Sequence, residues 1–251
     1  SFSTRYNSEF WDMVEIFESM EIWNGATPFA AGTINAKAFK KWLSLLDEGK
    51  RLTATTGSDT HNIYGDDYFG MTEWLDWLMD IVMKHPEIYP VHMNENVAYL
   101  TWLYNKVWPR LLSWVEQSNT PSTIHNYVYT NGKNQPQEIL QAIREGHSFI
   151  SNGPLVTAEV NGVSYGEKAV LKDRTGTLSV HVFSKKPINH LWMYTGADKK
   201  VELCAKADAA EGGFMYDIAA DELDFGDAAW VLFVADGGEN NLAISNPILF
   251  A

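Results

Sequence analysis

The hydrophobic pattern of the chain changes near residue 154, and this change sets the limits on its fold. Residues 155–251 form short runs of alternating apolar and polar residues, with turns such as Asn161-Gly162 between them and no convincing helical period. A period of two is typical of strands that bury one face. The strand-like runs are 156–160, 178–183, 190–194, 214–218, 230–234 and 243–250. They predict a C-terminal β-sandwich of roughly one hundred residues.

Strands and helices alternate in the part of the chain that comes before. Residues 20–24 are a short apolar run, a helical period covers residues 35–48, and a β-branched run at 52–56 ends at Gly57. Two strands joined by a helix make a β-α-β unit, in which functional groups collect at the C-terminal ends of the strands. Residues 20–61 therefore predict a patch of an α/β barrel or of an open sheet, with Asn24 and Asp59 at such ends.

Residues 71–117 are rich in Trp and Tyr and follow a helical period that is stopped once, at His85-Pro86. We expect a helical hairpin inserted after a strand, which either roofs a site, makes an oligomer contact or simply packs in the core. A strand at 124–130, a helix at 136–145 and a strand at 148–152 complete an α/β part that spans residues 1–154.

The charge of the chain restricts its partners. The formal net charge is −13 at pH 7, which repels nucleic acid and anionic membranes over most of the surface. No apolar stretch reaches the length of about 18 residues that a membrane span requires. The single cysteine, Cys204, excludes an internal disulfide and a cysteine-based zinc cluster. The composition predicts a soluble protein that binds no nucleic acid.

The strongest chemical signal is the pair Asp59 and His61, directly after the strand that ends at Gly57. In an extended or turn conformation, residues two apart point the same way, so a carboxylate and an imidazole can converge on one cation. Zinc, manganese and iron suit such a pair. The alternative is a helix cap or a surface turn, but the place at a strand end favours a metal site.

Several segments resemble one branch of the polymerase and histidinol phosphatase (PHP) superfamily. Gly57-Ser58-Asp59-Thr60-His61 resembles its last metal-binding motif. The segments that resemble its CehA/McbA-type branch are Glu21-Ile22-Trp23-Asn24-Gly25, Ala142-Ile143-Arg144-Glu145-Gly146, Ser151-Asn152-Gly153-Pro154 and Ser245-Asn246-Pro247-Ile248. Together they span most of the chain apart from residues 71–117.

The resemblance implies a distorted β/α barrel with a two- or three-metal centre at the C-terminal strand ends. It implies hydrolysis of phosphoesters, or of carbamates and related esters, by metal-bound water, with Asp59 and His61 as metal ligands. Glu21 and Asn24 are implied as pocket-lining residues only, and His125 as a contact for an anionic substrate. An ion pair or a solvent gap would explain Glu21 equally well, and a structural role would explain His125.

The sequence departs from the superfamily in its histidines. The family opens with a His-x-His pair and adds further His and Glu ligands, whereas all seven histidines here lie at or after position 61 and no His-x-His occurs. A catalytic zinc requires three protein ligands and a water. We therefore expect either the C-terminal portion of a hydrolase whose N-terminal segment, with any signal peptide, is missing, or a homologue that has lost the site. In both cases the metal site is incomplete in this chain alone.

Two functions follow as hypotheses. The first is part of a metal-dependent hydrolase that acts on a small-molecule ester. The second is a non-catalytic binding or scaffolding protein, whose β-sandwich and aromatic hairpin contact a partner or a glycan. An incomplete barrel would leave sheet edges uncovered, so self-association into a homo-oligomer is also expected.

Overall fold

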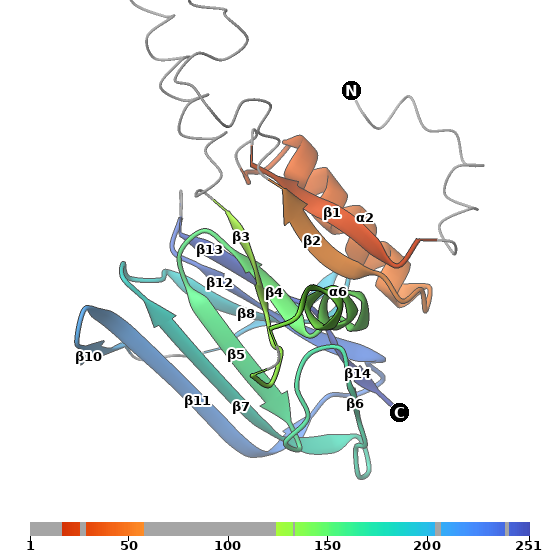
Figure 1. Ribbon diagram of the computed structural model, residues 1–251. Coiled ribbons are helices and arrows are strands. Elements are labelled where there is room, and N and C mark those ends of the chain that lie inside the picture. The colour runs from red at the N-terminus through yellow and green to blue at the C-terminus, as the bar shows by residue number, and fades with distance from the viewer. Residues whose placement is uncertain (1–16, 26–28, 58–123, 133, 204–206, 239–240) are drawn as a thin grey trace, which may run out of the picture. The chain divides into compact units, whose positions relative to one another are not determined.

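The computed structural model describes residues 17–25, 29–57, 124–132, 134–203, 207–238 and 241–251. All of these belong to one compact unit of the chain (Figure 1). Asp59, His61 and the hairpin expected at 71–117 lie outside the described residues.

The first described elements form the β-α-β unit that the sequence predicts. β1 (Ser19–Asn24) leads through α2 (Ile34–Asp47) to β2 (Thr53–Gly57). The two strands pair in parallel, with Asn24 opposite Gly57. The helix packs its apolar side against the strands because its buried residues recur at helical spacing.

The described chain after residue 123 contains one helix and a series of mostly antiparallel strands. The elements are β3 (His125–Val128), α6 (Pro136–Glu145), β4 (Ser148–Ser151), β5 (Leu155–Val160), β6 (Lys168–Ala169), β7 (Thr175–Ser184), β8 (His190–Gly196), β9 (Lys199–Glu202), β10 (Ala207–Ala210), β11 (Gly213–Asp224), β12 (Trp230–Asp236), β13 (Leu242–Ser245) and β14 (Ile248–Phe250).

These strands form two sheets. The smaller is antiparallel, with the order β10-β11-β7-β5. The larger has the order β3-β4-β13-β12-β14-β6, and β8 joins it on β12 with β9 beside β8. The β14 and β6 pair is parallel, and the other pairs of this sheet are antiparallel. Figure 1 shows β5, β7 and β11 in front of the larger sheet.

The alternating side chains of β12 show how the larger sheet is buried on both faces. Val231, Phe233 and Ala235 belong to a core cluster with Val156 of β5 and Val180 of β7. This cluster fills the space between the two sheets, as in sandwich packing.

The other face of β12 belongs to a second core cluster. Trp230, Leu232 and Val234 lie there with Trp42 of α2 and Ile22 of β1. The β-α-β unit therefore covers the outer face of the larger sheet. Because both faces of β12 are covered, its residues from 230 to 235 are all buried.

Tyr165 lies in the cluster between the sheets, 1% exposed, and its hydroxyl donates to the carbonyl oxygen of Val156 at 3.1 Å. Burial is the main cause that raises the pKa of Tyr165 well above its ordinary value of 10.0.

We expect Tyr165 to contribute to a loss of stability at alkaline pH. Above the ordinary tyrosine pKa the unfolded chain releases the phenol proton while the folded chain keeps it, so stability falls as the pH rises from there towards the raised folded pKa. Urea unfolding at neutral and strongly alkaline pH tests this, with Tyr165→Phe as the variant. The variant should lose less stability between the two pH values than the wild type, and equal losses would contradict the prediction.

The expectation of a distorted β/α barrel is wrong. The described residues contain two helices and fourteen strands in open sheets, and no sheet among them closes into a barrel. The strand predicted at 148–152 and the helix predicted at 136–145 are present, as β4 and α6. However, β4 pairs antiparallel with β13, so it belongs to the larger sheet.

Candidate functional site

The carboxyl ends of β1 and β2 lie side by side. Asn24, the last residue of β1, is opposite Gly57, the last residue of β2. The N–H of Gly25 then donates to the carbonyl oxygen of Gly57 at 2.7 Å, which holds the two ends together. In the sequence, Asp59 and His61 follow Gly57 directly but lie outside the described residues.

The side chain of Glu21 reaches this end of the strand pair. A Cβ atom added to Gly57 would lie 2.7 Å from Glu21 Oε2, so the carboxylate lies against the glycine. Asn24 Nδ2 donates to Glu21 Oε1 at 3.4 Å. The two pocket residues suggested by the sequence, Glu21 and Asn24, therefore lie together, and the absent side chain of Gly57 leaves room for the carboxylate.

A buried amide fixes the end of β1. Asn35, which is 1% exposed at the start of α2, accepts from the N–H of Asn24 at 2.9 Å and donates to the carbonyl oxygen of Asn24 at 3.0 Å. The Asn35 side chain thus pairs both backbone polar groups of Asn24. Sequence reasoning missed Asn35, because an asparagine in the first turn of a helix usually signals only a cap.

Two further asparagines hold the outer edge of β2, and we call Asn126 and Asn246 the asparagine clamp. Asn126 accepts from the N–H of Thr56 at 3.0 Å and donates to its carbonyl oxygen at 2.8 Å. Asn246 accepts from the N–H of Ala54 at 2.6 Å and donates to its carbonyl oxygen at 3.3 Å. Successive residues of a strand point their backbone groups to opposite edges, so β1 pairs one edge and the clamp pairs the other.

Asn246 is the more deeply placed member of the clamp. It is 0% exposed, and its Nδ2 also donates to the carbonyl oxygen and the hydroxyl of Ser148, at 3.0 and 2.9 Å. One side chain thus connects β2, β4 and the turn after β13. A buried amide with all of its partners in place stabilises a unique arrangement of the strands that it joins.

His125 faces away from the clamp. It is exposed on β3, and its ring centroid lies 5.9 Å from that of Tyr127 on the same face of the strand. Asn126, its neighbour in the sequence, points to the opposite face and reaches Thr56. The structure brings Glu21 and Asn24 together and places the His125 ring on another surface.

The described residues do not form a metal site by themselves. No group of three or more His, Cys, Asp or Glu side chains in this part of the chain is arranged to hold an ion. The donor set at the described strand end is a carboxylate and an amide, which suits a hard or borderline cation only with further ligands.

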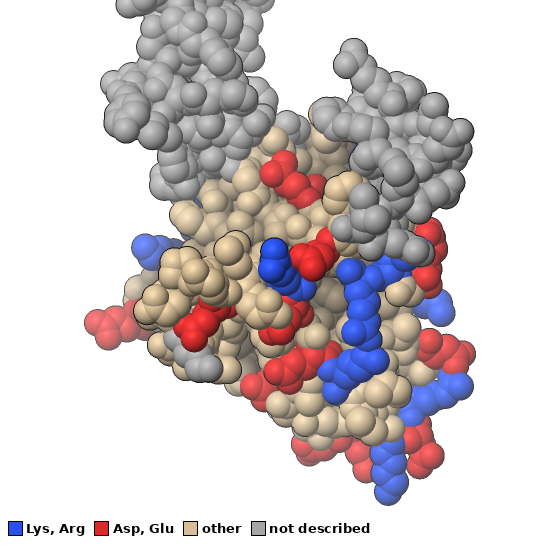
Figure 2. Space-filling model, turned by 45° about the vertical axis from the view of Figure 1, so that its right-hand side comes forward, with Lys and Arg blue, Asp and Glu red and all other residues tan. Residues whose placement is uncertain are grey.

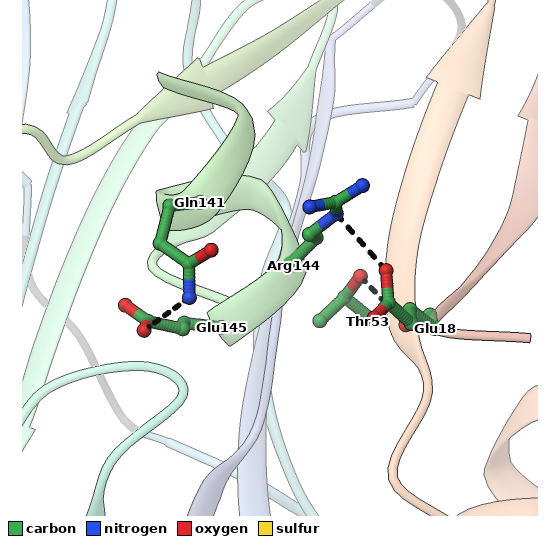
Figure 3. A network of polar contacts seen from close by, with 5 residues as sticks. All are labelled: Glu18, Thr53, Gln141, Arg144 and Glu145. Carbon is green, nitrogen blue, oxygen red and sulfur yellow. Dashed lines mark hydrogen bonds and ion pairs between the residues drawn. The ribbon is translucent and has the colours of Figure 1, made fainter. Parts of the chain in front are cut away.

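A polar network ties the opposite, amino-terminal end of the strand pair to α6 (Figure 3). Arg144 Nε lies 3.0 Å from Glu18 Oε2, and the N–H and hydroxyl of Thr53 both donate to the carbonyl oxygen of Glu18. Gln141 donates to Glu145 along the same helix at 2.7 Å. The side chains of Arg144 and Glu18 are 59% and 66% exposed, so this pair is worth only about 0–1 kcal/mol.

Figure 2 shows charged side chains of both signs on this face of the described residues, with acidic groups beside a run of basic ones. Among the described helices, none has the length and apolar character needed to cross a membrane.

No protein-family model, curated protein or solved structure matches this chain.

Proposed function

We propose that this chain is part of a metal-dependent hydrolase of the phosphoesterase type, with Asp59 and His61 as metal ligands. The observation that supports the proposal best is the common carboxyl end of β1 and β2, because functional groups of β-α-β units collect at such ends. Asp59 follows the last residue of β2 by two positions in the sequence.

The rigidity of β2 adds support. A metal site requires ligands held in place by their surroundings. β2 is hydrogen-bonded to β1 on one edge and to the asparagine clamp on the other, so the strand that leads to Asp59 is fixed on both sides.

A divalent zinc, manganese or iron ion, when bound, would lower the pKa of water and neutralise the charge that develops on an attacked ester oxygen. Asp59 and His61 would hold the ion, and Ser58 or Thr60 would hydrogen-bond one of these ligands. Two protein ligands fall short of the three that catalytic zinc uses, so at least one more donor is part of the proposal. The substrate class is a small-molecule ester. Glu21 and Asn24, which lie together, remain candidates for lining its pocket, whereas the His125 ring lies on another surface.

We expect this chain, which holds only two ligands of an incomplete site, to bind manganese or zinc weakly in a calorimetric titration. Asp59→Ala and His61→Ala should each abolish that binding, because loss of a ligand exceeds the cost of losing an outer-shell partner. His190→Ala is the matched control, since it removes a histidine that pairs with Glu202 in the β8 and β9 pair. Equal affinities for the wild type and both ligand variants would contradict the metal assignment.

Activity is tested with bis(p-nitrophenyl) phosphate and added manganese. The proposal predicts hydrolysis, slow because the metal site is incomplete in this chain alone, that a chelator abolishes and that Asp59→Ala reduces to the background rate. Hydrolysis that persists in both cases would place the activity elsewhere, and folded, metal-bound protein without hydrolysis would remove the phosphoesterase assignment.

Exposed tryptophan side chains would favour the second hypothesis, a binding or scaffolding protein. Trp23, Trp42 and Trp230 are buried, and Trp192 is half-buried with Lys200 Nζ 3.9 Å from its ring centroid. The tryptophans of the described residues therefore do not favour this hypothesis, and the aromatic hairpin on which it also rests lies outside them.

A further inference from the structure

The open face of the smaller sheet carries a serine, a histidine and an aspartate in a hydrogen-bonded line. Ser179 and His181 are two residues apart on β7, so their side chains share a face. Asp217 lies directly across from His181 on β11. Ser179 Oγ is 3.0 Å from His181 Nε2, and His181 Nδ1 is 2.5 Å from Asp217 Oδ1.

The chemistry of these groups determines where the protons lie. An ionised carboxylate only accepts hydrogen bonds, so His181 Nδ1 carries a proton and donates a hydrogen bond to Asp217. In the neutral imidazole, Nε2 then presents a lone pair to the hydroxyl of Ser179. The serine therefore donates to a base that is itself oriented by a carboxylate, which is the arrangement that activates a serine nucleophile.

The site is accessible to solutes, but it does not stabilise the oxyanion that forms during attack on an ester with a poor leaving group. The side chains of His181 and Asp217 are 56% and 55% exposed. β7 lies between β5 and β11, so the backbone N–H groups around Ser179 are engaged in the sheet and do not form an oxyanion hole. An attack that succeeds here requires a carbonyl carbon whose leaving group departs easily.

We propose that Ser179 is a nucleophile that accepts an acyl group from activated esters, with His181 as its general base and Asp217 as the positioning residue. The site is separate from the strand end of β1 and β2, and it requires no metal ion.

The step balances as an acyl transfer. Ser179 Oγ forms a bond to the carbonyl carbon of the ester, and its proton passes to His181 Nε2. The bond between that carbon and the leaving oxygen breaks, and its electron pair departs with the leaving group as an aryl oxide. Asp217 stabilises the imidazolium that forms and takes up no proton.

The test is acetylation of the full chain by p-nitrophenyl acetate in the presence of a chelator. The release of p-nitrophenolate gives the rate, and peptide mass mapping gives the position of the acetyl group. We expect the label on Ser179, no label at that peptide in Ser179→Ala, and labelling at least about 100-fold slower in His181→Ala, which loses the general base.

Two comparisons separate activation from mere exposure. Thr177→Ala removes a hydroxyl two residues earlier on the same face of β7, and it should leave the labelling rate unchanged. Asp217→Asn should slow labelling without a change in thermal unfolding, whereas Asp217→Glu, which keeps a carboxylate, should retain more of the rate. Wild-type protein without acetyl on Ser179, or equal rates for the wild type and His181→Ala, would overturn the proposal.

Discussion

Asn246→Leu is expected to lower the free energy of unfolding by about 3–5 kcal/mol, although the leucine side chain branches at the same carbon and has as many heavy atoms as that of asparagine. The substitution removes the partner of the N–H and of the carbonyl oxygen of Ala54, both of which Asn246 pairs in a buried position. An unpaired buried polar group costs about 1–3 kcal/mol, and this variant leaves both of these Ala54 groups without a partner. It also removes the two bonds from Asn246 Nδ2 to Ser148.

Urea unfolding measures the total effect, and hydrogen exchange at the Ala54 amide reports the local one. Asn126→Ala is the matched comparison, because Asn126 makes the same two bonds to Thr56 in a partly buried position. Its loss should cost less, about 1–2 kcal/mol, since water can reach the freed groups. A cost below that of Asn126→Ala for the buried asparagine would show that the clamp does not hold β2.

The second large effect is expected for Trp42→Ala, which should cost about 3–5 kcal/mol. Trp42 is 0% exposed in the cluster between α2 and the larger sheet, and its Nε1 donates to the carbonyl oxygen of Leu52 at 2.8 Å. Alanine would leave a cavity and an acceptor without its donor in the same place.

Two further variants divide the effect of Trp42 into its parts. Trp42→Phe keeps most of the apolar volume and loses the donor, so it should cost about 1–3 kcal/mol. Val170→Ala removes apolar atoms from a side chain that is 72% exposed and should change stability by less than about 0.5 kcal/mol. Equal costs for Trp42→Ala and Val170→Ala in urea unfolding would contradict the packing described for α2.

Much of the local structure could be predicted because its signals lie within one segment. The helix predicted at 136–145 is confirmed as α6, and Gly146 ends it in the left-handed conformation at φ 80°. The predicted turn Asn161-Gly162 has positive φ at both residues, 53° and 73°. The predicted β-α-β unit is also confirmed, as β1, α2 and β2. It could be predicted because each of its strands and its helix has its own hydrophobic pattern.

The open sheets, in place of a barrel, could not be predicted from the sequence, because a strand pattern does not say which strand edge pairs with which partner. The free edge of β2 is taken by side chains that are 70 and 192 residues away in the sequence. A further parallel strand would be needed on that edge to extend the sheet towards a barrel. In the sequence, Asn126 and Asn246 stand among the apolar residues of strand-like runs. An amide side chain in such a run needs a hydrogen-bond partner when it is buried, and this was the one signal that could have pointed to the clamp.

The site formed by Ser179, His181 and Asp217 could also be predicted only in part from the sequence. The spacing of Ser179 and His181 predicts a shared face of a strand. Asp217 is 36 residues from His181, and only the register of β7 and β11 brings the two together. Asp59 and His61, by contrast, are close together in the sequence itself, and their role as metal ligands stays a prediction.

Anomalous X-ray diffraction from crystals grown with manganese or zinc tests the metal assignment most directly. The account predicts a single strong peak at coordinating distance, about 2.0–2.2 Å, from a carboxylate oxygen of Asp59 and an imidazole nitrogen of His61. A peak only at another pair, such as His190 and Glu202, or side chains of Asp59 and His61 that share no metal, would contradict it.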